Sequence, residues 1–165
     1  MAEFIGLFFT YLGLVLLIIA ACIAFVLARN VPAGQKAVVW YRWISLLSVG
    51  FLGIYTFVMH AFFPEIASAN IGWARSPFEY EVAVANLAVG LLAVVAFCKQ
   101  TSHGFRVASV LAAAVWYWGD AVGHIYQMLV QHNFTAGNAG VWFWMDVIVP
   151  IVLIALLVNS KKGSN

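Results

Sequence analysis

Long apolar runs separated by short polar connections dominate this chain. Five of them have about the 20 predominantly apolar residues that a helix needs to cross the hydrocarbon core of a bilayer. They are Phe4–Leu27, Ala37–Phe63, Pro77–Phe97, Phe105–Val130 and Val141–Val158. Helices are favoured in lipid because they satisfy their own backbone hydrogen bonds. The pattern therefore predicts an all-α fold, a polytopic membrane protein built as a bundle of five transmembrane helices.

The composition agrees with a membrane protein and excludes an ordinary soluble domain. Hydrophobic residues make up 65% of the 165 positions and charged residues 8%, and the mean hydropathy is +0.98. A soluble chain of this size has too little polar surface to cover so many apolar side chains. We expect a single transmembrane domain over residues 1–160, in contact with the lipid bilayer, and a short cytoplasmic tail over residues 161–165.

The distribution of lysine and arginine between the connections predicts an orientation. Cationic side chains accumulate on the cytoplasmic side of membrane proteins. They flank the first and third connections and follow the last run, whereas the second connection has one arginine and the fourth has none. We therefore expect the N-terminus outside and the C-terminus inside. No basic patch with interleaved aromatic residues occurs, so nucleic acid is not an expected partner.

The third and fourth runs carry signals for helix start and helix packing. Ser76, Pro77 and Glu79 form a capping box with proline at the first helical position, so Glu79 is expected to cap backbone amides. The third run is rich in small residues, and the fourth contains Gly119-x-x-x-Gly123. Small residues let membrane helices approach closely. We expect these two helices to be central and adjacent, and the first helix to be peripheral.

A few polar and ionisable side chains interrupt the apolar runs. Such groups are costly in hydrocarbon, so each is expected to have a partner or a function. At a helical rise of about 1.5 Å per residue, they lie at similar depths on separate helices, mostly in the outer half of the bilayer. In the fourth run, Asp120, His124 and Gln127 share one stripe because their spacing is i, i+4 and i+7. These positions predict one shared, buried site.

Carboxylate and imidazole groups on facing helices are typical of metal centres in helical bundles. A mixed nitrogen and oxygen set suits a divalent transition metal such as Zn, Fe or Mn better than a soft copper site. The expected ligands are Glu81, Asp120 and His124, with His60 or Asp146 completing the shell. The side chains expected to support these ligands through hydrogen bonds are Asn86, Gln127 and Glu79.

Other interpretations of the same residues stay open. His60 and His124 lie on two helices, as two axial ligands of a haem b would, although carboxylates beside the iron fit this poorly. The group could instead pass protons in a small proton-linked carrier. It could also only lock the helices of a non-catalytic accessory subunit, in a homo-oligomer or a larger membrane complex. If the chain is an enzyme, the expected chemistry is a metal-activated water acting on a lipid-like substrate.

Two further features bear on the interior of the bundle. Trp116, Tyr117 and Trp118 are consecutive and lie near mid-bilayer, so at least one of their rings must point into the bundle. Pro150 falls in the middle of the last run, where it frees the carbonyl of Asp146 and favours a kink.

Three segments carry a resemblance to a known group of proteins. They are Ser76–Leu87, Gly119–Met128 and Trp144–Pro150. Over these segments the chain resembles a family of small, uncharacterised bacterial membrane proteins, which implies residence in a bacterial cytoplasmic (inner) membrane. The resemblance supplies no activity and no cofactor. The residues that it implies for the family's pattern are Glu81, Asn86, Asp120, His124, Gln127 and Asp146.

Overall fold

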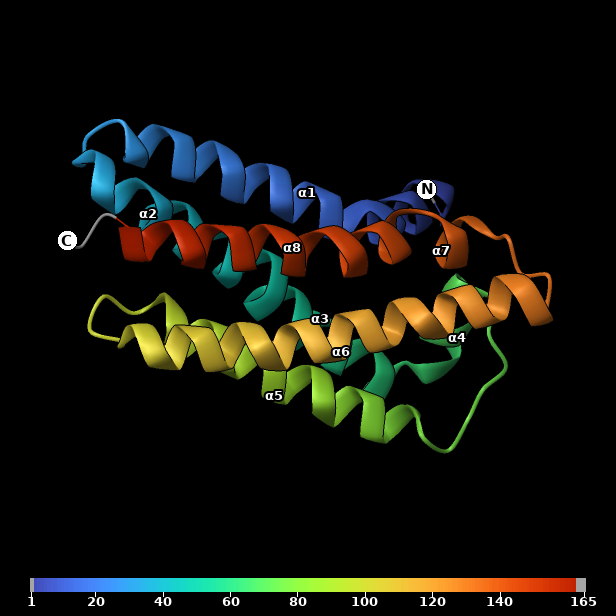
Figure 1. Cartoon of the computed structure of the whole chain (residues 1–165). Helices are drawn as coiled ribbons and strands as arrows, with labels where there is room; N and C mark the ends of the chain where they lie inside the picture. Colours follow the sequence, from blue (N-terminus) through green and yellow to red (C-terminus); the bar gives the residue numbers. More distant parts are fainter. Residues whose placement is uncertain (1, 163–165) are drawn as a thin grey trace.

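The structure, a computed structural model, describes residues 2–162 of the chain and the side chains of residues 10–160. This part of the chain is almost entirely helical and contains no β-strand. Its long helices run alongside one another (Figure 1). They are α1 (Ala2–Ala28), α2 (Ala33–Ser45) continued by η1 (Leu46–Phe51) and α3 (Leu52–Phe62), α5 (Glu79–Phe97), α6 (His103–Val130) and α8 (Val141–Lys162). The short helices α4 (Pro64–Ile71) and α7 (Ala136–Ala139) pack together at one end.

Each long apolar run predicted from the sequence forms a helix whose ends lie within four residues of the predicted boundaries. Of the tail expected over residues 161–165, the first two residues extend α8, and residues 163–165 lie outside the described residues. The second run is one continuous helical rod interrupted by a turn of π-helix, η1. The π-helical turn and the two short helices were not expected from the sequence.

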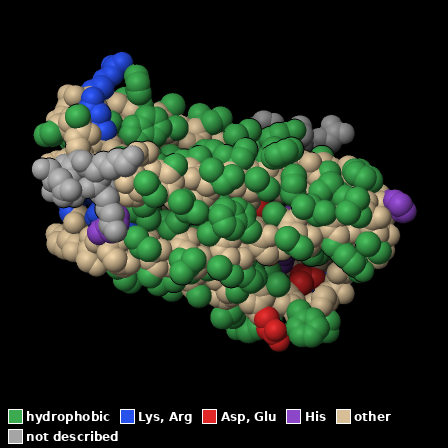
Figure 2. All heavy atoms as spheres, viewed as in Figure 1, with side chains coloured by type: hydrophobic (Ala, Val, Ile, Leu, Met, Phe, Trp, Pro, Cys, Tyr) green, Lys and Arg blue, Asp and Glu red, His purple; other side chains and the backbone are tan. Residues whose placement is uncertain are grey.

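The outer surface of the molecule is apolar, as Figure 2 shows for one face. Four helical stretches in the described residues are long and apolar enough to cross a membrane: Thr10–Ala28, Ala33–Phe62, Glu79–Phe97 and Ala136–Ser160. The 28-residue α6 packs against α5 and α8. It is not among these four stretches, and its polar stripe lowers its mean hydropathy. The predicted class, an all-helical chain with membrane-type helices, is therefore confirmed.

Close helix packing occurs between the continuous η1–α3 segment and α5 at three glycines, Gly50, Gly53 and Gly90. A Cβ atom added to Gly53 would lie 2.7 Å from the Asn86 carbonyl oxygen, and one added to Gly90 would lie 3.1 Å from the Gly50 carbonyl oxygen. Larger residues would force these two backbones apart. Helix α5 also contacts α6, as expected. The Gly119-x-x-x-Gly123 motif does not produce this contact between α5 and α6, because a Cβ at Gly119 would meet nothing within 4 Å.

Basic side chains gather at one end of the bundle (Figure 2), and α4 and α7 lie at the opposite end (Figure 1). Two of them cap the C-terminus of α5. Arg42 Nε donates to the Phe97 carbonyl at 2.5 Å, and Arg106 donates to the carbonyls of Ala96 (3.3 Å) and Cys98 (3.1 Å). These bonds satisfy carbonyls that a helix end leaves without intrahelical partners, and the positive charge complements the helix dipole.

Candidate functional site

A cavity of about 570 Å³ lies in the half of the bundle that holds α4 and α7. It is bordered by α3, α4, α5, α6, α8 and the connection between α4 and α5. The residues that line it include no lysine or arginine. Its ionisable lining side chains are His60, Glu79, Asp120, His124 and Asp146. Its large aromatic lining side chains are Tyr55, Trp73, Phe78, Tyr117 and Trp142.

Glu79 and His60 form an acid–imidazole pair on one wall of the cavity. Glu79 Oε1 accepts hydrogen bonds from the Ser68 hydroxyl and from the backbone N–H of Ser76 (3.3 Å). The predicted capping contact of Glu79 therefore exists, although α5 begins at Glu79 rather than at Pro77. Glu79 Oε2 lies 3.8 Å from His60 Nδ1. Both of these atoms are buried, and neither has a hydrogen-bond partner among the described residues.

His124 is held by Asn138, a residue of α7 with no exposed surface. Asn138 Nδ2 donates to the carbonyls of His124 (3.2 Å) and Asn133 (2.9 Å). Because both amide hydrogens are used in this way, Oδ1 is the atom that faces the imidazole, 2.8 Å from His124 Nδ1. An amide oxygen can only accept, so Nδ1 carries a hydrogen. The other ring nitrogen, Nε2, is then a bare acceptor in the neutral imidazole.

Nε2 of His124 faces the carboxylate of Asp146, with Oδ2 at 3.6 Å. Two acceptors repel each other, so this pair is attractive only when it holds a proton, on either the imidazole or the carboxyl. The Trp73 ring packs edge-on against His124 with 5.3 Å between ring centroids. The Trp73 indole also donates to Asn138 Oδ1 at 2.6 Å. The pair is thus a proton-binding group in a fixed orientation.

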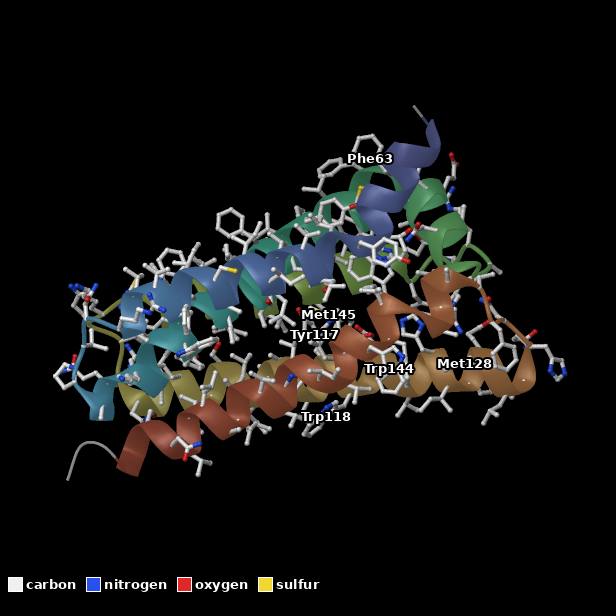
Figure 3. All side chains as sticks on the ribbon, turned by 90° about the horizontal axis from the view of Figure 1, so that it is seen from above. Phe63, Tyr117, Trp118, Met128, Trp144 and Met145 are labelled. Carbon is white, nitrogen blue, oxygen red and sulfur yellow. The ribbon has the colours of Figure 1, made fainter. Side chains whose placement is uncertain are left out.

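Asp120 lies one helical turn before His124 and lines the same cavity. Its carboxylate makes no hydrogen bond or ion pair with the described residues. Tyr117, on the same side of α6, is 5% exposed and donates to the Ser48 carbonyl of η1 at 3.1 Å. Figure 3 shows Tyr117 within the bundle and Trp118 on its outside, so the expectation that one ring of this triplet points inward is confirmed.

Asn86 borders the cavity, and both of its side-chain polar atoms are hydrogen-bonded within the protein. Its Oδ1 accepts from Trp116 Nε1 at 3.2 Å, and its Nδ2 donates to the Val82 carbonyl at 3.0 Å. This side chain joins α5 to α6, which is the packing role that a buried amide often has. Gln127, predicted to support the same site, does not line the cavity.

Glu81 is the expected ligand that the structure places elsewhere. Its side chain is exposed on α5 and does not line the cavity. Two residues along a helix turn the side-chain direction by about 200°, so only one of Glu79 and Glu81 can face the interior. Positions along an apolar run predict how deep these carboxylates lie in the bilayer, but not the direction in which they point about the helix axis.

The predicted metal centre gains no support from this arrangement. Within the described part of the chain, no three His, Cys, Asp or Glu side chains lie close enough together to hold a metal ion. The absence of Glu81 from the cavity removes one of the three principal ligands. The remaining groups are arranged as two acid–imidazole pairs and the Asp120 carboxylate, which lies near enough to Asp146 to interact with it.

Several residues of the site were not found from the sequence. Asn138 and Trp73 lie in connections that carry no apolar periodicity, and Ser68 lies in a short helix within a predicted loop. The only sequence signal was the richness in Asn, Gly and Thr between the last two helices, which indicates a turn. That signal gives no reason to expect a buried amide.

Over its described residues, the chain is therefore an all-helical protein with four helical stretches long and apolar enough to cross a membrane, and with a cavity whose wall carries ionisable side chains. The chain belongs to a family of unknown function (DUF6790), whose model matches residues 7–165. Membership of an uncharacterised family, expected from the sequence, is thereby confirmed. No curated protein and no solved structure matches the chain.

Proposed function

We propose that this chain is a small proton-linked carrier that spans a bacterial cytoplasmic membrane five times, with its N-terminus outside. In addition to the four stretches named above, we take α6 as a fifth membrane-spanning helix. Its outward face supports this, because Leu111, Val115 and Val122 are large apolar residues exposed by 64%, 69% and 66%. The basic end of the bundle is assigned to the cytoplasm by the positive-inside rule. The cavity then lies toward the outer side.

The pair formed by His124 and Asp146 is the observation that carries this proposal. Asn138 fixes the imidazole so that its bare nitrogen points at a carboxylate 3.6 Å away. A single proton added to this pair changes repulsion between two acceptors into attraction. A group that gains and loses a proton inside a ligand-sized cavity is the basic element of proton-linked transport.

The cavity has the dimensions and lining of a small-molecule site. Its volume of about 570 Å³ falls within the range of about 300–1,000 Å³ that is usual for such sites. The wall is mainly apolar and aromatic, with a few convergent polar groups. Three polar atoms of the wall are buried without a hydrogen-bond partner among the described residues: His60 Nδ1, Glu79 Oε2 and Trp142 Nε1. A bound polar group would satisfy them.

A pH titration of tryptophan fluorescence in purified protein tests the proton-binding pair. Protonated imidazole quenches a neighbouring indole, so Trp73 should report the charge of His124. We expect wild type to show a fluorescence step that His124→Gln removes and Asp146→Asn shifts. Glu81→Gln is the matched control, since it changes an acidic residue outside the cavity, and it should keep the step. Identical titrations of wild type and His124→Gln would contradict the proposal.

Transport itself is tested in liposomes loaded with a pH-sensitive dye. With the interior acidic, external addition of an organic amine, a carboxylate or a sugar, one at a time, should release protons for at least one class. His124→Gln should abolish this flux, and Glu81→Gln should keep it. A chain that moves protons with none of these classes, and whose variants only lose thermal stability, would be an accessory subunit instead. If purified wild type contains a stoichiometric metal ion and His124→Ala lacks it, the chain holds a metal centre instead.

A further inference from the structure

One carboxylate of the cavity wall, that of Asp120, has no positively charged group to balance it in the described part of the chain. Of the three carboxylates, Glu79 faces His60 at 3.8 Å and Asp146 faces His124 at 3.6 Å. Each of these pairs is compensated by one proton. Asp120 has neither a hydrogen-bond partner nor a cationic partner among the described residues, and no lysine or arginine lines the cavity. It interacts with another carboxyl, that of Asp146, so the two acidic side chains repel each other when both are charged.

An isolated carboxylate away from water is strongly disfavoured unless it is protonated or meets a cation. Asp120 therefore holds either a proton or one positive charge supplied from outside the protein. The two occupants exclude each other, because both need the same carboxylate oxygens. The complementary ligand is a monovalent cation.

Asp120 also borders a second hollow, a shallow groove of about 520 Å³ between α5 and α6. Apart from Asp120, the groove is lined by apolar side chains and a glycine, among them Val89 of α5 and Leu111 and Val115 of α6. Leu111 and Val115 are on the outward, exposed face of the bundle. A Cβ at Gly119 would meet nothing within 4 Å, so this position leaves the groove open.

The groove and the cavity have Asp120 as their common lining residue. In a chain surrounded by lipid, the groove faces acyl chains, and Asp120 is the polar group at its end. A molecule with an apolar chain and a cationic head is complementary to an apolar groove that ends at a carboxylate. The aromatic rings of the cavity, including Tyr117, add a surface on which an ammonium group is favoured by cation–π attraction.

We propose that the substrate is an amphiphilic monocation, with an ammonium head at Asp120 and an alkyl chain in the groove between α5 and α6. The proposal rests on the proposed carrier function, because it names the substrate class of that cavity. Binding exchanges one proton for one cation: the protonated Asp120 carboxyl releases H⁺ as the ammonium group arrives. Charge is conserved, and no covalent bond of the ligand changes.

Binding of decyltrimethylammonium to the purified protein in nanodiscs tests this proposal, with tetramethylammonium and decanol as probes that lack the chain or the charge. Wild type should bind decyltrimethylammonium most tightly and release a proton into weak buffer. Asp120→Asn should weaken that binding by about 30-fold or more, as expected when one partner of a desolvated charge pair is removed. It should leave decanol binding unchanged and abolish the proton release.

Two further variants separate the head-group site from the groove. Gly119→Leu adds an alkyl side chain at a position where a Cβ meets no atom within 4 Å and which lines the groove. It should weaken the binding of decyltrimethylammonium and leave that of tetramethylammonium unchanged. Glu81→Gln removes an equal charge outside the cavity and should leave both affinities unchanged. Equal affinity of wild type and Asp120→Asn for decyltrimethylammonium would overturn the proposal. An equal effect of Gly119→Leu on both cations would overturn the assignment of the groove.

The source of the ammonium group is distinguished by competition with dodecylphosphocholine. Strong displacement supports a lipid head group, and weak displacement supports a free amphiphilic amine. Wild type that keeps the His124-dependent fluorescence step but binds neither cation would refute only the substrate class. Wild type that lacks both the step and cation binding would refute the carrier function as well.

Discussion

Replacement of Asn138 by alanine should be among the most damaging single changes in this chain. The amide has no exposed surface and makes four hydrogen bonds, with Trp73, the ring and the carbonyl of His124, and the Asn133 carbonyl. A typical buried hydrogen bond contributes about 1 kcal/mol net, so the loss of four predicts a cost of about 4 kcal/mol. Such a cost is in the exceptional tail of single substitutions.

Thermal unfolding in detergent, followed by circular dichroism, measures this cost. At about 2–4 °C per kcal/mol for a chain of this size, Asn138→Ala should lower Tm by about 8–16 °C. Asn159→Ala is the matched control, because Asn159 is exposed and donates only to the Ala155 carbonyl of its own helix (3.0 Å). That control should change stability by less than about 0.5 kcal/mol. Equal Tm values for the two variants would refute the network.

Three other substitutions test particular contacts by the same unfolding measurement. Gly137→Ala should cost about 3 kcal/mol or more, because its Cβ would lie 1.8 Å from the Asn70 carbonyl oxygen and force α4 and α7 apart; an unchanged Tm would contradict that contact. Gly119→Ala should stabilise by up to about 1 kcal/mol, since alanine favours the helix and meets no neighbour; a lower Tm would contradict the open groove. Tyr117→Phe should cost about 1–3 kcal/mol by leaving the buried Ser48 carbonyl without its donor; a neutral effect would show that this bond adds nothing.

The long helices could be predicted from the sequence because an apolar run of 20 residues leaves few alternatives in a small chain. The short elements could not. Helix α4 has eight residues and α7 has four, too few to give a periodic signal, and they lie where turn-forming residues predict a loop. The π-helical turn η1 depends on how the chain packs around Ser48 and Gly50, which are buried against neighbouring helices.

The part of the candidate site that lies on a single helix could be predicted from the sequence. Asp120 and His124 are four residues apart, so they must share a face of α6 whatever surrounds that face. Depth alone also predicted that His60 and Asp146 lie at a similar level, and both residues line the same cavity as Asp120 and His124. The choice between Glu79 and Glu81 did not, because depth says nothing about rotation, and both carboxylates lie near the same level. The direction is set by Ser68 and Ser76, which hold Glu79 at the start of α5.

The distribution of satisfied and unsatisfied polar groups separates a structural network from a binding site. A network that only locks helices should satisfy its members, because a partly satisfied buried group costs more than an apolar one. Asn86 and Asn138 behave in this way, because each polar atom of these two side chains is hydrogen-bonded within the protein. His60 Nδ1, Glu79 Oε2 and Trp142 Nε1 do not, because these buried atoms have no hydrogen-bond partner among the described residues, and all three belong to residues that line one cavity. Polar atoms that lack hydrogen bonds in a wall that is otherwise well bonded are therefore better explained by a ligand than by packing.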